Sequence, residues 1–290
     1  MSRRHRQWGS VWATAQDSPQ AQRRHYVRAS TPHPAKMLPA IARHAIGAYT
    51  SPGDLVLDPM CGIGTTLVEA LRAGRHACGV ELEPRWSAVA AANLRRAGRA
   101  GLSATMRTGD ARGLPGLFPD LHGRIDLVVT SPPYGPGVHG RVMTARDLPA
   151  DTPGLVRFDR DYGHDRANLA HRPLPQLLDD LADILTGCST LLAAHGRVVV
   201  ATRPFRVGGE LVDLPGLVTA AAHQAGLVPA ERCVALLAAW RRGRLASRPS
   251  FFALDYARRS TSAGRPVAVI VHEDILVFTK TGDQHMRAVS

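Results

Sequence analysis

Lysine is almost missing from this 290-residue chain. Lys36 and Lys280 are the two lysines among 36 basic residues, so 36 − 2 = 34 are arginine, and 24 acidic residues leave a net charge of +12. GC-rich coding favours arginine over lysine, whereas a surface that binds a polyanion such as nucleic acid needs basic residues of either kind. The charge alone therefore leaves both explanations open.

Cysteine is also scarce, and long apolar runs are missing. The four cysteines are far apart and form no CxxC pair, which argues against a disulfide framework and a zinc site. No window of about 18 apolar residues predicts a membrane helix. Residues 1–16 are basic but lack the apolar core of a signal peptide. We therefore expect a cytoplasmic protein that uses neither a metal ion nor a membrane.

Apolar strands and amphipathic helices alternate along most of the chain. We expect strands at 55–57, 76–80, 104–106, 125–130, 197–202, 231–238 and 274–279, and helices at 35–48, 65–73, 83–97, 174–192 and 214–226. This alternation predicts an α/β protein with a doubly wound parallel sheet and helices on both faces.

The domain boundaries follow from where the alternation begins and ends. We predict a domain over 33–281, after a loosely ordered basic arm at 1–32 and before a tail at 282–290. Two long irregular segments, 135–173 and 241–266, interrupt the domain. Long loops in compact domains are usually functional, so we interpret these two as lid or target-recognition insertions.

A glycine-containing loop follows the first predicted strand of the sheet. Asp58 ends the strand, Gly62 and Gly64 follow, and the next helix begins at Thr65. Glycine lets the backbone approach a ligand closely, and a helix N-terminus suits an anionic group. An NAD-binding loop would carry Gly or Ala where Leu67 stands. Asp58 would repel a pyrophosphate but could pair with an amino group.

Two further strand ends carry acids, and a third carries an unusual tetrapeptide. Glu81 lies 81 − 64 = 17 residues after Gly64, near the ~20 residues typical of a ribose-binding acid. Asp110 ends the following strand. Ser131, Pro132, Pro133 and Tyr134 come directly after the strand at 125–130. The prolines have no N–H, so a serine hydroxyl and free carbonyls can accept hydrogen bonds from an amino group, and the tyrosine can stack on a base.

Together these features resemble the class I, Rossmann-like methyltransferases that use S-adenosylmethionine. The tetrapeptide resembles the (Asp/Asn/Ser)-Pro-Pro-(Tyr/Phe/Trp) motif of the DNA cytosine-N4 and adenine-N6 methyltransferases, and the resemblance covers about 33–280. It implies S-adenosylmethionine as the cofactor and Ser131, Pro132, Pro133 and Tyr134 as the catalytic residues. It also implies a set of cofactor-binding residues: Lys36, Asp58, Pro59, Cys61, Gly62, Gly64, Thr65, Thr66, Glu81, Leu82, Asp110 and Ala111.

The resemblance leaves the target base open. Serine at the first motif position favours cytosine N4 in DNA, as in restriction–modification systems. Gly135 after Tyr134 is shared with the tRNA guanine-N2 methylases, so RNA is an alternative, and so is adenine N6 in DNA. Methylation at cytosine C5 is disfavoured because the Pro-Cys pair that it needs is absent. A non-catalytic nucleic-acid-binding module is a lower alternative, and the oligomeric state is open.

The segment 241–266 is the predicted nucleic-acid-binding surface. It mixes arginines with Phe251, Phe252 and Tyr256, which suits phosphate contacts and base stacking. A solvated arginine-rich loop around core aromatics remains the alternative. The predicted nucleic-acid-binding residues are Arg241, Arg242, Arg244, Arg248, Arg258 and Arg259.

Overall fold

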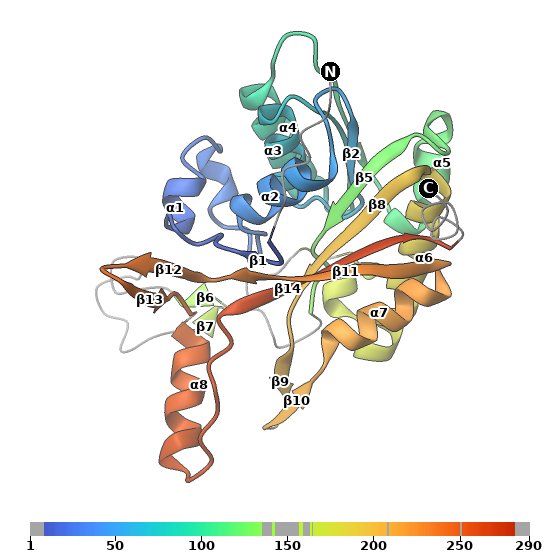
Figure 1. Ribbon diagram of the computed structural model, residues 1–290. Helices are drawn as coiled ribbons and strands as arrows, with labels where there is room; N and C mark the ends of the chain where they lie inside the picture. Colours follow the sequence, from blue (N-terminus) through green and yellow to red (C-terminus); the bar gives the residue numbers. More distant parts are fainter. Residues whose placement is uncertain are drawn as a thin grey trace, which may run out of the picture.

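The order of the strands across the central sheet differs from their order along the chain. The computed structural model describes residues 9–134, 141–142, 157–158, 163, 165–207, 209–249 and 251–281. Eight strands run in the order β1-β11-β14-β8-β5-β2-β3-β4 (Figure 1). Their bounds are β1 Val11–Trp12, β2 Leu55–Asp58, β3 His76–Glu81, β4 Ala104–Thr108, β5 Ile125–Thr130, β8 Leu192–Thr202, β11 Leu227–Leu236 and β14 His272–Lys280.

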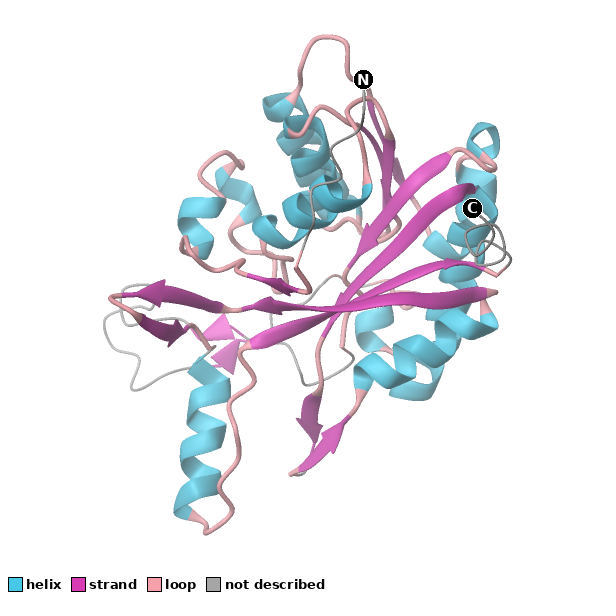
Figure 2. Cartoon of the chain, viewed as in Figure 1, coloured by secondary structure: helices cyan, strands magenta, loops and turns pink. Residues whose placement is uncertain are grey.

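Helices cover both faces of this sheet, as Figure 2 shows, and the predicted α/β class is confirmed. One apolar core joins the sheet to α2 (Pro39–Tyr49), α3 (Thr65–Arg72) and α4 (Pro84–Ala97). A second core joins the other face to α5 (Leu114–Leu117), α6 (Leu174–Leu191) and α7 (Leu214–Gln224). Leu127 and Val129 enter the first core and Val128 the second, because successive side chains of a strand point to opposite faces. This explains why β5 is apolar throughout.

The expectation of a fully parallel sheet was wrong at one side. Strands β4, β3, β2, β5 and β8 are parallel, but β14 is antiparallel to both β8 and β11. A parallel return needs a crossover over the sheet. The chain between β11 and β14 instead leaves the sheet and comes back at the same end (Figure 1). Apolar periodicity carries no information about strand direction, so the sequence could not reveal this.

The predicted loose arm is also corrected, because residues 9–32 pack onto the domain. Strand β1 pairs in parallel with β11, and the side chain of Trp12 is 1% exposed. Its ring stacks on His44 with 4.1 Å between centroids. Tyr26 is buried, and its hydroxyl donates a hydrogen bond to Glu69 (3.1 Å). The high arginine content of this segment concealed two large aromatics that join the core.

The segment 241–266 is regular rather than irregular. Strands β12 (Ala238–Arg241) and β13 (Arg244–Ser247) form a hairpin, and α8 (Phe251–Ser262) follows. The two central residues of the hairpin loop, Arg242 and Gly243, have φ of 47° and 73°, as the two-residue turn of a twisted hairpin requires. In Figure 1, α8 projects away from the sheet.

The remaining elements are short. Much of the predicted insertion 135–173 lies outside the described residues, apart from the strand pair β6 and β7 and residues near α6. Among the described residues, no helix is both long and apolar enough to cross a membrane. The short elements are α1 Pro19–Gln22, β6 Arg141–Val142, β7 Arg157–Phe158, β9 Phe205–Val207 and β10 Glu210–Val212, with 3-10 turns at Arg28–Ser30, Ala111–Gly113, Pro119–Leu121 and Leu169–His171.

The packing of residues 9–32 can be tested with one substitution. Trp12→Ala should lower the free energy of unfolding by about 3–5 kcal/mol, because it leaves a cavity under β1. The measurement is urea unfolding followed by circular dichroism. Trp240→Ala is the matched control, since that side chain is 60% exposed and its loss should cost less than about 1 kcal/mol. Equal effects of the two substitutions would show that the segment contributes no core.

Candidate active site

A cavity of about 610 Å³ lies where the parallel strands end. Its wall includes Asp58 and Glu81, at the ends of β2 and β3, together with Asp110 after β4 and Arg203 after β8. In doubly wound sheets, ligands bind at the carboxyl ends of the strands. The volume lies within the range of about 300–1,000 Å³ typical of small-molecule pockets.

Most of the residues predicted for the site meet in this cavity. Gly64, Thr66 and five of the six predicted DNA-binding arginines do not line it. The predicted residues that do line it are Lys36, Asp58, Pro59, Cys61, Gly62, Thr65, Glu81, Leu82, Asp110, Ala111, Ser131, Pro132, Pro133, Tyr134 and Arg248.

The loop after β2 is held by its own acid. Asp58 is 3% exposed. Its Oδ2 accepts a hydrogen bond from the Thr66 hydroxyl (2.7 Å), and its Oδ1 accepts one from the Met60 amide (3.1 Å). Thr66 therefore positions Asp58 rather than lining the cavity. Burial raises the pKa of Asp58 to about 6, against the opposing effect of these hydrogen bonds.

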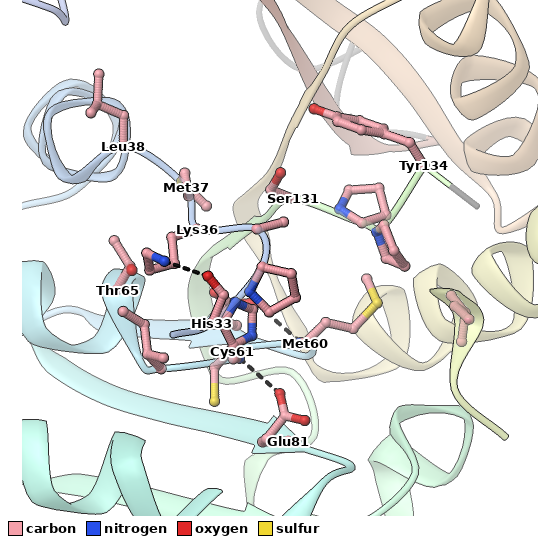
Figure 3. Close-up of a pocket in the computed structure, with 18 of the residues that line it drawn as sticks. His33, Lys36, Met37, Leu38, Met60, Cys61, Thr65, Glu81, Ser131 and Tyr134 are labelled. Atoms are coloured by element: carbon pink, nitrogen blue, oxygen red, sulfur yellow. Dashed lines mark hydrogen bonds between the residues drawn. The ribbon is translucent and has the colours of Figure 1, made fainter. Parts of the chain in front are cut away.

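Gly62 ties the loop to the neighbouring strand. Its amide donates to Glu81 Oε2 (2.8 Å), and its φ is 54° (Figure 3). A Cβ at this position would lie 3.1 Å from the His33 ring. Glu81 Oε1 accepts from the Glu83 amide (2.8 Å). Burial is the main reason why the pKa of Glu81 rises to about 7.

Close packing of α3 on the sheet depends on a glycine that the sequence motif did not include. A Cβ at Gly79 would lie 2.8 Å from Leu67 and 3.1 Å from the Asp58 carbonyl. In the NAD fingerprint, the small residue that permits helix–strand contact lies on the helix. Here Leu67 fills the helix position, and Gly79 on β3 supplies the space.

Asp110 forms an ion pair within the protein, which the sequence did not suggest. Both of its carboxylate oxygens accept hydrogen bonds from the Arg112 guanidinium (Nε to Oδ1 and Oδ2, 3.0 Å each). Arg112 also contacts Asp180 on α6 (2.8 Å). These contacts, first of all the hydrogen bonds from Arg112, lower the pKa of Asp110. Asp110 still lines the cavity, but its carboxylate is already paired.

The tetrapeptide after β5 forms the far wall of the cavity. Tyr134 is 8% exposed, and its ring lies 6.5 Å from that of Phe205 between centroids. The Arg203 guanidinium lies 5.5 Å from the centre of the tyrosine ring. Burial raises the pKa of the Tyr134 hydroxyl, whereas Arg203 and the Ser131 side chain act in the opposite direction. Figure 3 shows the Ser131 and Tyr134 side chains on the same side of this turn.

Sequence reasoning missed several lining residues. Asn168 and its neighbours come from the end of the insertion, and Asn168 Nδ2 donates to Glu83 Oε1 (2.9 Å). Met60 belongs to the glycine loop itself, and His33, from the segment before it, lies beside Gly62 (Figure 3). Arg203 and Glu273 enter from the ends of β8 and β14. Arg203 could have been found, because it follows a predicted strand, β8, that lies next to the strand before the tetrapeptide. Nothing in the sequence indicated that β14 places Glu273 at the cavity.

The predicted nucleic-acid-binding arginines fall into three positions. Arg241, Arg242 and Arg244 are exposed at the tip of the β12–β13 hairpin. Arg248 lies at its base, where its amide donates to the Leu237 carbonyl (2.8 Å), and both residues line the cavity. Arg258 and Arg259 are exposed on α8, where Arg259 pairs with Asp255 (2.8 Å). The hairpin therefore rises from the rim of the cavity.

No metal centre was expected from the sequence. Within the ranges that the structure describes, no three His, Cys, Asp or Glu side chains are grouped as metal ligands. Because other residues lie outside those ranges, the absence of a metal stays a prediction.

The sheet with helices on both faces and a cavity at the strand ends is the architecture that the sequence predicted, and comparisons with known proteins bear on its family. Residues 1–92 match the family model described as DNA methylase. The tRNA (guanine(10)-N2)-dimethyltransferase of Methanocaldococcus jannaschii is 33% identical over 105 residues, 36% of this chain and 30% of that protein. The 4-amino-L-phenylalanine/4-methylamino-L-phenylalanine methyltransferase of Streptomyces pristinaespiralis is 33% identical over 176 residues, 59% of this chain and 54% of that protein. The chain thus spans about half or less of these relatives.

Likeness to solved structures is weaker. A TehB-like SAM-dependent methyltransferase from Corynebacterium glutamicum aligns with a TM-score of 0.43 and 16% identity over 83% of this chain and 87% of that chain, which is too low to bear on function. The sequence matches carry the assignment. Residues 1–92 are similar to the DNA methylases, and the two relatives named above are methyltransferases that share part of their length with this chain.

The residues of the cavity fit S-adenosylmethionine, the cofactor that the sequence motifs predict. The cofactor carries cationic and hydroxyl donors, and the cavity offers two buried carboxyl groups, Asp58 and Glu81, whose pKa values are raised chiefly by burial. Gly62 leaves open a surface that a side chain would occupy beside His33. Acceptor chemistry and space are therefore both present.

This electrostatic arrangement predicts pH-dependent cofactor binding. Donors on the cofactor favour ionised carboxyls, so affinity should fall by up to about tenfold per pH unit once the pH drops below the pKa of Glu81, about 7. In Glu81→Gln, affinity should be weaker and should begin to fall only near the pKa of Asp58, about 6. Calorimetry from about pH 8 to about pH 5 measures both curves, and titration of the cofactor itself affects both proteins equally. Identical pH profiles would refute the role of Glu81.

Proposed function

We propose that this protein transfers a methyl group from S-adenosylmethionine to an exocyclic amino group of a nucleobase, and that the target is cytosine N4 in DNA. One observation carries the proposal. Ser131, Pro132 and Tyr134 share a single cavity with Asp58 and Glu81, so an amino group held by the tetrapeptide lies in the same cavity as the cofactor residues.

The proposed chemistry requires the protein to hold and orient its two reactants. S-adenosylmethionine, when bound, supplies a methyl group on a positively charged sulfur. Asp58 and Glu81 accept hydrogen bonds from the donors of the cofactor. The Ser131 hydroxyl and the Pro132 carbonyl accept the two hydrogens of the target amino group, which concentrates electron density on its nitrogen. The buried ring of Tyr134 offers an apolar face for the base.

The cysteines support an amino target over a carbon target. Methylation of cytosine C5 needs a reactive thiolate. Cys61 is the cysteine that lines the cavity, and burial raises its pKa well above the usual value. A neutral, buried thiol is a poor nucleophile, so Cys61 acts as a small packing residue.

The relatives supply a second candidate, guanine N2 in RNA. Two observations favour an RNA target. The M. jannaschii relative is named for that reaction on tRNA, and Gly135 follows the tetrapeptide here. The DNA methylase family model over residues 1–92 favours DNA, as does serine at the first position of the motif.

The β12–β13 hairpin is the proposed contact with the sugar–phosphate backbone. Its tip carries Arg241, Arg242 and Arg244 without an acid between them, and Trp240 beside them is 60% exposed. Two-stranded ribbons of this kind fit the major groove of DNA. Because the base of the hairpin lies at the cavity rim, a duplex bound there would bring a flipped base near the tetrapeptide.

Methyl transfer tests the function directly. The purified protein, labelled S-adenosylmethionine and either DNA or RNA should yield labelled N4-methylcytosine from DNA after digestion to nucleosides and mass spectrometry. Tyr134→Ala should lower turnover at least about 100-fold, with cofactor affinity changed less than about threefold, because the ring contacts the base alone. Label in N2-methylguanine from RNA would select the second candidate, and no label in either polymer would refute the proposal.

Salt dependence tests the hairpin. Changing Arg241, Arg242 and Arg244 to Gln should reduce the slope of log affinity against log salt concentration by about 3, because each lost phosphate contact releases about one counterion fewer. Fluorescence anisotropy with a labelled duplex measures the slope. The matched control changes Arg95, Arg96 and Arg99, which are exposed on and after α4, and should leave it unaltered. Equal slopes in both triple variants would exclude the hairpin.

A further inference from the structure

An acid that plays no part in the mechanism above lies in the wall of the cavity. Glu273 belongs to β14, where it pairs with Ala235 of β11. The next residue, Asp274, pairs with Thr202 at the end of β8, which brings Glu273 beside Arg203. Glu273 and Arg203 line the cavity together with Ser131 and Tyr134. Glu273 also acts electrostatically on the Tyr134 hydroxyl.

Glu273 is half-buried, and one oxygen of its carboxyl group has no hydrogen-bond partner among the described residues. Its Oε2 is inaccessible and accepts no hydrogen bond from any residue that the structure describes. Burial raises its pKa, and the charge of Arg203 opposes this shift. The adjacent Asp274 differs, because its Oδ1 accepts two hydrogen bonds from Arg232 (3.0 and 2.8 Å). An unmet polar atom in a buried position is costly unless a ligand supplies its partner.

A ring that carries the target amino group can supply a partner to this carboxyl group. In cytosine, adenine and guanine, a ring nitrogen adjoins the carbon that bears the amino group. In cytosine and adenine this nitrogen accepts a hydrogen bond, and a protonated carboxyl can donate one. In guanine N1 carries a hydrogen, and an ionised carboxylate can accept it. An aniline ring has a C–H at the same place, which offers neither.

We propose that Glu273 recognises the ring nitrogen beside the target amino group, so that the cavity selects an aminated heteroaromatic ring, a nucleobase, over an aniline. This inference rests on the proposed function and narrows its substrate class. It separates this chain from the S. pristinaespiralis relative, whose name gives a 4-amino-L-phenylalanine substrate. Arg203, 5.5 Å from the Tyr134 ring, supplies a positive charge that opposes protonation of Glu273.

The test couples a protein change to a substrate change. The wild-type protein first identifies the methylated base. Oligonucleotides then carry either that base or its deaza analogue, in which the ring nitrogen beside the amino carbon is a C–H: 3-deazacytosine, 1-deazaadenine or 1-deazaguanine. We expect wild-type kcat/KM to fall about tenfold on the analogue, the worth of one hydrogen bond. The kcat/KM of Glu273→Ala should be about tenfold below that of wild type on the natural base and should not fall further on the analogue.

Two more variants keep the test decisive. Glu273→Gln retains a donor and an acceptor, so it should stay within about threefold of wild type on the natural base. Glu210→Ala, at an exposed site on β10, is the control and should respond to the analogue as wild type does. Cofactor affinity must be unchanged in every variant, which separates recognition from misfolding.

The outcomes distinguish the two proposals. If the wild-type protein methylates no base, the proposed function fails. If it methylates a base but kcat/KM falls equally for Glu273→Ala and for wild type on the deaza analogue, the function stands and the role of Glu273 is overturned. Faster methylation of 4-amino-L-phenylalanine than of any nucleic acid would overturn the proposed selection of a nucleobase over an aniline.

Discussion

The hydrogen bond from the Gly62 amide to Glu81 joins the two structural halves of the cofactor end of the cavity. It links the loop after β2 to the end of β3 at 2.8 Å. Two glycines make this contact possible. Gly62 adopts a positive φ beside His33, and Gly79 lets Leu67 of α3 lie against β3. A side chain at either position would push the loop away from the strand and separate the two acids that the cavity brings together.

Those acids give the cavity its chemical character. Asp58 and Glu81 are buried, and their pKa values rise to about 6 and about 7 because burial outweighs their hydrogen bonds. Asp110 behaves in the opposite way, since Arg112 neutralises it and lowers its pKa. Among the described residues, the acids in one part of the cavity have no ion-pair partner, whereas the acid in the neighbouring part is already paired. A cationic ligand is stabilised in the first part and gains little in the second.

The sequence predicted local features well and relationships between distant segments poorly. Strand β5 and helices α3, α4 and α6 follow from apolar periodicity and glycine or proline signals, and lie within one or two residues of the predicted ranges. The direction of β14 did not follow, because an antiparallel strand has the same apolar pattern as a parallel one. Trp12 was missed for a related reason. A single buried aromatic in an arginine-rich segment has no period to reveal it.

Glu273 illustrates the same limit within the site. Its neighbours in the sequence predict a strand, but its place in the cavity depends on the reversal of β14 against β8. That reversal arises because the chain between β11 and β14 leaves the sheet as the β12–β13 hairpin and α8 and returns at the same end (Figure 1). The strand that carries Glu273 therefore follows, along the chain, the β12–β13 hairpin that bears Arg241, Arg242 and Arg244. The arginines at the tip of the hairpin and the acid in the cavity wall therefore belong to one continuous stretch of chain that runs from β11 to β14.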